Sequence, residues 1–138
     1  MATQSSRRWW ALATVASAQF IAVCDAFIVN VAIPSIRADL HADAAEIQAV
    51  VAVYQIAYAA LVITGGRLGD IFGRKRIFIT GVLGFTLASL WCGLSGSPTE
   101  LIIARAVQGI GGALLVPGSL ALISSCFSEK ERGKAIGT

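Results

Sequence analysis

The sequence predicts an all-α membrane protein that crosses the bilayer several times. Of its 138 residues, 56% belong to the hydrophobic set and only 14% are charged. Soluble domains carry about 25% charged residues, and a soluble chain of this length could not bury so much apolar surface. The charges also leave three uninterrupted stretches of 20, 23 and 23 residues, at 47–66, 77–99 and 106–128. Each stretch can cross a hydrocarbon core of about 30 Å as a helix.

The first expected span covers about residues 9–33. It follows Arg7 and Arg8 and contains one charged residue, Asp25. Trp9 and Trp10 stand where aromatic rings prefer the headgroup region of a bilayer. A secretory signal cleaved after Ala18 is an alternative, but the apolar sequence continues beyond that point, which favours a retained span.

Three further spans are expected at about 47–65, 77–94 and 101–123, with the start of a fifth helix at about 132–138. Together they form one unit, residues 1–138, which we interpret as a truncated N-terminal transmembrane bundle. Nine Lys or Arg residues precede the first span or lie after the even-numbered spans, whereas one, Arg37, lies on the opposite side. This bias predicts a multi-pass protein of the cell membrane with a cytoplasmic N-terminus. The basic charge is therefore explained by topology, and we expect no nucleic-acid partner.

Two charged residues lie inside the expected spans, at Asp25 and Arg105. An ionisable group there costs at least about 2.5–3.5 kcal/mol, so it is by default a candidate for function. Counting at about 1.5 Å per residue places both in the outer half of the bilayer, close enough in depth for the arginine to reach the aspartate. We expect them to face each other. The alternative is that Arg105 extends to the outer interface while Asp25 stays neutral.

Polar and small residues accompany Arg105 on one helical face. Gln108, Gly109 and Gly112 follow it at i+3, i+4 and i+7, a face suited to another helix or a watery cavity. Pro117 predicts a bend further along the same span. Tyr54, Gln55 and Tyr58 in the second span could contact an organic compound, although helix packing explains them equally well. The residues expected in a cavity or in helix packing are Asn30, Gln55, Gln108, Gly109, Gly112 and Pro117.

The segment 65–76, expected as an inner loop, is the most specific part of the sequence. Glycines recur every four residues at Gly65, Gly69 and Gly73, and Asp70 is the one acid among four bases. Asp70 can pair with Arg74 at i+4 or lie against the positive N-terminal end of another helix. Either contact could act as a latch in one conformation.

Three segments resemble signatures of the major facilitator superfamily. Residues 66–76 resemble its loop signature G-x-L-a-D-r-x-G-r-k, and residues 101–113 resemble its fourth-helix signature l-x-x-x-R-x-x-q-G-x-g-a-a. Residues 24–34, Cys-Asp-Ala-Phe-Ile-Val-Asn-Val-Ala-Ile-Pro, resemble the first-helix signature of the fourteen-span drug:proton antiporters. Ile71 departs from the pattern, because the family often has a basic residue there.

The resemblance implies a secondary transporter that exports small drug-like compounds in exchange for protons by alternating access. It implies that Asp25 and Arg105 couple the proton, and that Gly66, Asp70, Gly73 and Arg74 form a gating contact at the inner face. An apolar site favours the protonated form of an aspartate and a nearby arginine favours the charged form, so their separation would govern the proton. The implied partners are the lipid bilayer, a small-molecule substrate, protons and C-terminal helices that lie beyond residue 138.

Two other classes of protein remain as alternatives. One is a complete small four-helix exporter acting as a dimer, and the other is a membrane protein whose polar residues serve helix assembly only. An enzyme is not expected, because the single histidine, His41, lies among acids in an outer loop and no phosphate-binding glycine loop is present. Cys24, Cys92 and Cys126 show no metal-ligand spacing and are expected as small apolar filler, so we expect neither cofactor nor metal.

Overall fold

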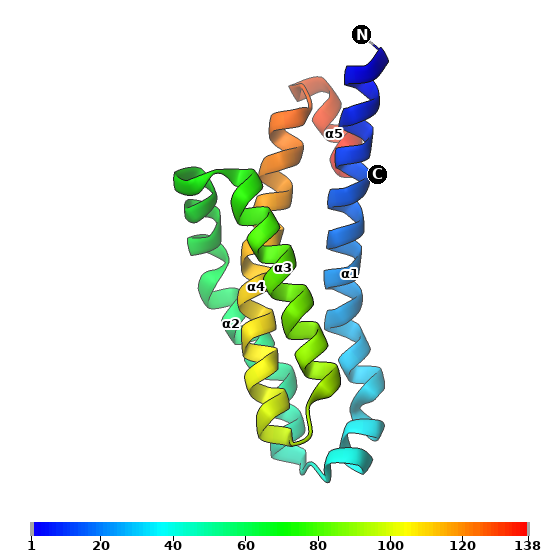
Figure 1. The fold of residues 1–138 in the computed structure, drawn as a ribbon, viewed down its shortest axis with the longest axis vertical. Coiled ribbons are helices and arrows are strands. Elements are labelled where there is room, and N and C mark those ends of the chain that lie inside the picture. The colour runs from blue at the N-terminus through cyan, green and yellow to red at the C-terminus, as the bar shows by residue number, and fades with distance from the viewer. Residues whose placement is uncertain (1, 138) are drawn as a thin grey trace.

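The computed structural model describes residues 2–137 and confirms the all-α expectation. Its five helices are α1 (Ala2–Leu40), α2 (Ala44–Phe72), α3 (Arg74–Leu94), α4 (Pro98–Cys126) and α5 (Glu129–Gly137) (Figure 1). Helices α1 to α4 are long and apolar enough to cross a membrane. The α1–α2 and α3–α4 connections lie at one end, and the N-terminus and α5 lie at the other. We refer to these as the outer and inner ends, after the charge-based prediction.

The helices extend beyond the stretches that the hydrophobic pattern marks. Helix α1 runs through Pro34 and includes Arg37, and α2 continues seven residues past the expected end at 65. The pattern marks the part of a helix inside the bilayer, whereas the backbone remains helical until a residue stops it. Asp43 provides such a boundary at the start of α2, where its side chain and that of Glu46 form a reciprocal capping box.

The segment 65–76 is helical and not the loop that we expected. Residues up to Phe72 belong to α2, and α3 begins at Arg74. Gly73 alone separates the helices, with a φ of 101° that a side chain would rarely adopt. Its amide donates to the Gly69 carbonyl at 3.1 Å and so completes the last turn of α2. Asp70 and Arg74 are therefore held on two helices joined by one residue.

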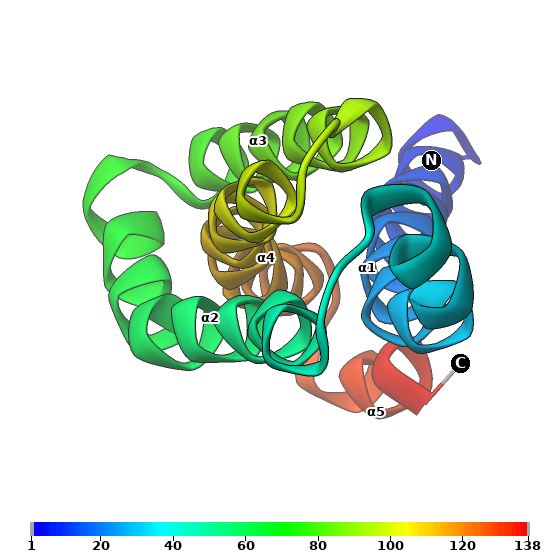
Figure 2. The same cartoon turned by 90° about the horizontal axis from the view of Figure 1, so that it is seen from below.

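Helix α4 lies between α2 and α3 and contacts both through glycine (Figure 2). A Cβ atom at Gly109 would lie 2.6 Å from the carbonyl oxygen of Tyr54 on α2, and one at Gly111 would lie 2.7 Å from the amide of Phe85 on α3. Both distances are too short for a real side chain, so the backbones approach as closely as glycine permits. The structure therefore explains the small residues of α4 by packing on two sides.

Pro117 affects the same packing from within α4. The helix continues through it, and the bend expected there stays a prediction. Because proline has no N–H, the carbonyl of Ala113 receives no i+4 hydrogen bond. Gly65 of α2 packs directly against this carbonyl, and an added Cβ would overlap its oxygen. Gly81 of α3 also approaches α4 closely, whereas a Cβ added at Gly84 would have no such neighbour within 4 Å.

Helix α1 packs less closely than the other long helices. Its buried residues are Leu12, Val15 and Ala22, while Phe27 and Val31 are exposed to 68% and 79%. An exposed apolar face suits a helix that contacts lipid. Close packing thus unites α2, α3 and α4, and α1 lies against them with fewer contacts.

Candidate functional site

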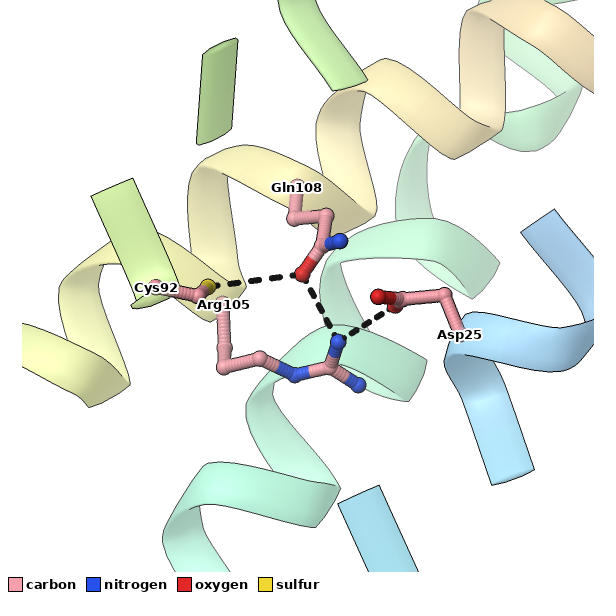
Figure 3. A network of polar contacts seen from close by, with 4 residues as sticks. All are labelled: Asp25, Cys92, Arg105 and Gln108. Atoms are coloured by element: carbon pink, nitrogen blue, oxygen red, sulfur yellow. Dashed lines mark hydrogen bonds and ion pairs between the residues drawn. The ribbon is translucent and has the colours of Figure 1, made fainter. Parts of the chain in front are cut away.

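The polar contact between α1 and α4 is made by the two charged residues inside the spans. Nη1 of Arg105 donates to Oδ2 of Asp25 at 2.7 Å (Figure 3). The side chain of Arg105 is 3% exposed and that of Asp25 is 16% exposed. The contact predicted from their depths is confirmed, and the alternative in which Arg105 extends to the outer interface is wrong. Removing one partner of a pair at this burial would leave the other charge buried without compensation, which is far more costly than breaking a surface pair.

Gln108 holds the arginine from the other side. Its Oε1 accepts from Nη1 of Arg105 at 2.7 Å and from the thiol of Cys92, on α3, at 3.5 Å (Figure 3). Because two donors converge on one atom, that atom must be the amide oxygen. The expectation that Cys92 is only apolar filler is therefore wrong. No spacing in the sequence indicated this contact, since it depends on how α3 is turned toward α4.

An aromatic ring covers the guanidinium. The guanidinium carbon of Arg105 lies 4.3 Å from the ring centroid of Tyr54, and Tyr58 stacks on that ring with centroids 6.4 Å apart. Tyr54 also packs against Gly109 and Gly112, whose missing side chains leave room for its backbone and hydroxyl. These glycines therefore serve helix packing, and through it they bring the ring to the arginine.

The network is not fully paired among the residues that the structure describes. Nε of Arg105 and Nε2 of Gln108 are buried and have no hydrogen-bond partner there. An unsatisfied buried donor costs about 1–3 kcal/mol. A further hydrogen-bond acceptor beside these two donors would therefore stabilise the network. A change of conformation or a bound molecule could supply it.

A cavity of about 390 Å³ connects this network with the outer end of the bundle. The network lines one part of it and the ends of α1 and α3 line the other; the lining includes Asp25, Cys92, Arg105, Gln108, Ser35, Asp39 and Ser95. Asn30 and Gln55, which were expected in a cavity or in packing, are exposed and do not line it.

The residues of the expected gating contact lie at the inner end. Nη2 of Arg74 and Oδ1 of Asp70 are 3.6 Å apart, and Nη1 of Arg74 donates to the Ala121 carbonyl near the end of α4 at 3.4 Å. Both side chains are largely exposed, so the pair by itself adds little stability. An added Cβ at Gly66 would make only an ordinary contact with Pro117, 3.7 Å away. Of the two partners considered for Asp70, the structure shows Arg74.

Replacing Tyr54 with leucine tests the contact over the arginine. We expect the free energy of unfolding to fall by about 1–2 kcal/mol, because leucine offers no π face to the buried cation. The measurement is unfolding by sodium dodecyl sulfate in mild detergent micelles, followed by circular dichroism. Tyr54→Phe keeps the ring and should lose less than half as much. Equal losses in both variants would mean that the hydroxyl, and not the ring, carries the effect.

The sequence was compared with protein-family models and with known proteins. The family model of the Major Facilitator Superfamily matches residues 15–138. The chain is 47% identical over 132 residues to the puromycin resistance protein of Streptomyces alboniger, in a match that covers 95% of this chain and 26% of that protein. It is 43% identical to the cephamycin export protein of Amycolatopsis lactamdurans, in a match that covers 94% of this chain and 27% of that protein. It is 40% identical to the tetracenomycin C resistance and export protein of Streptomyces glaucescens, in a match that covers 95% of this chain and 24% of that protein. The chain thus spans about a quarter of the length of these relatives.

Proposed function

The chain belongs to the Major Facilitator Superfamily, and from this premise we propose that it is the first part of an exporter of small organic compounds driven by protons. It is a transporter sequence and not that of an enzyme. The names of its relatives, which refer to resistance or export, support a drug-like substrate. Since those relatives are about four times as long, we propose that further helices complete the substrate pathway.

The observation that carries the proposal is the buried ion pair at the end of a cavity. A proton that enters from the outer end passes the exposed Asp39 and then reaches Asp25, the carboxylate that is paired with Arg105. Its binding neutralises the carboxylate and removes the attraction to Arg105. The arginine side chain keeps its contacts with Gln108 of α4 and with the ring of Tyr54 on α2. Helix α1, whose polar hold on α4 is this pair, is then free to move against the packed unit of α2, α3 and α4.

The reverse step follows from the same contacts. When Arg105 again approaches the carboxylate, the charged form of Asp25 is favoured and the proton leaves. If the cavity has by then closed outward and opened inward, the proton is released to the cytoplasm. A membrane potential of 100 mV adds about 2.3 kcal/mol for each charge that crosses, which is enough to drive export against a gradient. This alternation agrees with rigid-body movement of repeats about a central site.

The inner end supplies a contact suited to control this alternation. We propose that Asp70, Arg74, Gly66 and Gly73 form a gate, in which Arg74 joins the end of α2 to the end of α4. The contact is exposed and weak, so a modest change of conformation can break it. The cytoplasmic N-terminus that this scheme requires is supported by the bias of basic residues to the inner end.

The test is export by a full-length form, in which residues 1–138 replace the matching segment of the puromycin resistance protein. Proteoliposomes are loaded with puromycin, and its release is followed after the outside is acidified. We expect a pH gradient to accelerate release and a protonophore to abolish the acceleration. Release at the same rate with and without the gradient would contradict proton coupling.

The 138-residue chain alone serves as the second arm. We expect it to release no more puromycin than protein-free vesicles, because it lacks the second wall of a substrate site. Robust export by the chain alone would instead favour the small four-helix exporter acting as a dimer.

A further inference from the structure

A second hollow lies at the inner end, between α1 and α3, away from the ion pair. It has a volume of about 580 Å³ and is lined at its polar end by Arg7, Arg8 and Lys75. Toward the bilayer centre its walls are apolar and include Val15, Phe78 and Ile79. Arg7 and Arg8 belong to α1 and Lys75 belongs to α3, so the packing of the two helices brings these cations together.

The charge at the polar end remains largely unopposed among the described residues. The carboxylate of Glu131 on α5 already accepts hydrogen bonds from the hydroxyl and the amide of Ser128, which hold the pKa of Glu131 below its usual range. Glu131 also lies close enough to Arg8 for the positive charge of Arg8 to lower its pKa slightly. One acid committed elsewhere leaves an excess of positive charge over the hollow.

We propose that this hollow, a groove between α1 and α3, binds an anionic phospholipid. The lipid phosphate would lie at Arg7, Arg8 and Lys75, and an acyl chain would lie along the apolar walls. The groove has the two-part chemistry of such a lipid, since a free phosphate would gain nothing from the apolar walls. Its depth fits as well. From Arg7 to Val15 is eight residues, or about 12 Å along the helix, which leads from headgroup level into the hydrocarbon. The proposal does not depend on the transport mechanism or on which face of the membrane the inner end occupies.

The chain contains its own reporters for the test. Trp9 and Trp10 follow Arg8 directly and are 57% and 74% exposed, whereas Trp91 lies toward the outer end. The purified 138-residue chain carrying Trp91→Phe is placed in phosphatidylcholine vesicles that contain a brominated lipid, which quenches nearby tryptophan. In one arm this lipid is brominated phosphatidylglycerol, and in the other it is brominated phosphatidylcholine at the same fraction.

We expect phosphatidylglycerol to occupy the groove with roughly fivefold preference over phosphatidylcholine, the ratio that about 1 kcal/mol produces for one basic residue near a net negative lipid charge. Both lipids carry a phosphate, but the choline cation of phosphatidylcholine cancels its negative charge. Arg7→Gln/Arg8→Gln/Lys75→Gln should reduce the ratio to near one. Equal quenching by both brominated lipids in the unmodified groove would overturn the proposal.

A matched control separates the groove from general attraction to a negative surface. Arg67→Gln/Arg76→Gln/Lys130→Gln removes the same charge from the inner end but from residues that do not line the groove. It should keep the preference, and a loss equal to that of the groove variant would overturn the site. Lys75→Gln against Arg76→Gln repeats the comparison with single changes if the triple variant does not fold.

Free phosphate is distinguished by competition. Sodium phosphate is compared with sodium chloride at equal ionic strength, so that both screen the charges alike. We expect the preference for phosphatidylglycerol to be the same in both. Its loss in phosphate alone would identify a soluble anion as the occupant and overturn the assignment to lipid.

Discussion

Replacing Asp25 with asparagine in the full-length form is expected to reduce puromycin release driven by a pH gradient by roughly 100-fold, the lower range for loss of a group that transfers a proton. Asparagine keeps the shape of the side chain and an oxygen that can accept from Arg105, but it cannot bind and release a proton. The measurement is the initial rate of release after the outside of the proteoliposomes is acidified.

Two further variants make this result specific. Asp39→Asn removes a carboxylate from the outer part of the same cavity and should leave the rate within about twofold, because Asp39 is exposed and makes no contact with Arg105. Exchange of puromycin across the vesicle without a pH gradient should persist in Asp25→Asn, which shows that the variant folds and binds. Unchanged proton-driven release would remove Asp25 from the mechanism and favour a role in helix assembly alone.

Among the glycine-to-alanine changes in this chain, Gly65→Ala should produce the largest loss of stability. The new Cβ would overlap the carbonyl oxygen of Ala113, which belongs to the backbone of α4 and cannot turn aside as a side chain can. We expect the free energy of unfolding to fall by about 3 kcal/mol, the upper part of the usual range for overpacking. The measurement is unfolding by sodium dodecyl sulfate in micelles, with the yield of folded protein as a second readout.

Gly69→Ala is the matched control, one turn further along the same helix. Nothing lies within 4 Å of a Cβ at this position, so alanine should be neutral or stabilise the helix by about 0.5–1 kcal/mol. If both variants lost the same stability, a general intolerance of α2 to alanine would explain the result, and the close approach to Ala113 would not.

The sequence predicted the number of spans and the pairing of Asp25 with Arg105, because both follow from depth along a helix. An apolar stretch records where the bilayer lies, and a count of residues from its edge fixes the height of each charged group. The ends of the helices could not be read in this way. Helix α2 remains helical to Phe72 although its charged last turns lie beyond the apolar stretch, and the expected loop proved to be a single glycine.

The rotation of each helix about its axis was also beyond the sequence. A membrane helix is apolar on nearly all sides, so its pattern does not indicate which side faces a neighbour. For this reason Cys92 was not expected beside Gln108, and packing and ligand contact were equally good explanations of Tyr54. Asn30 and Gln55 illustrate the converse, because a polar residue suggests a partner without identifying it, and both are exposed here.

At their closest points α4 meets α2 and α3 through backbone, and this affects how such a protein can evolve. At positions 109 and 111 any larger residue would separate the helices, so these positions have almost no freedom to change. Related sequences could therefore differ in the residues of the cavity while the spacing of these helices stays constant.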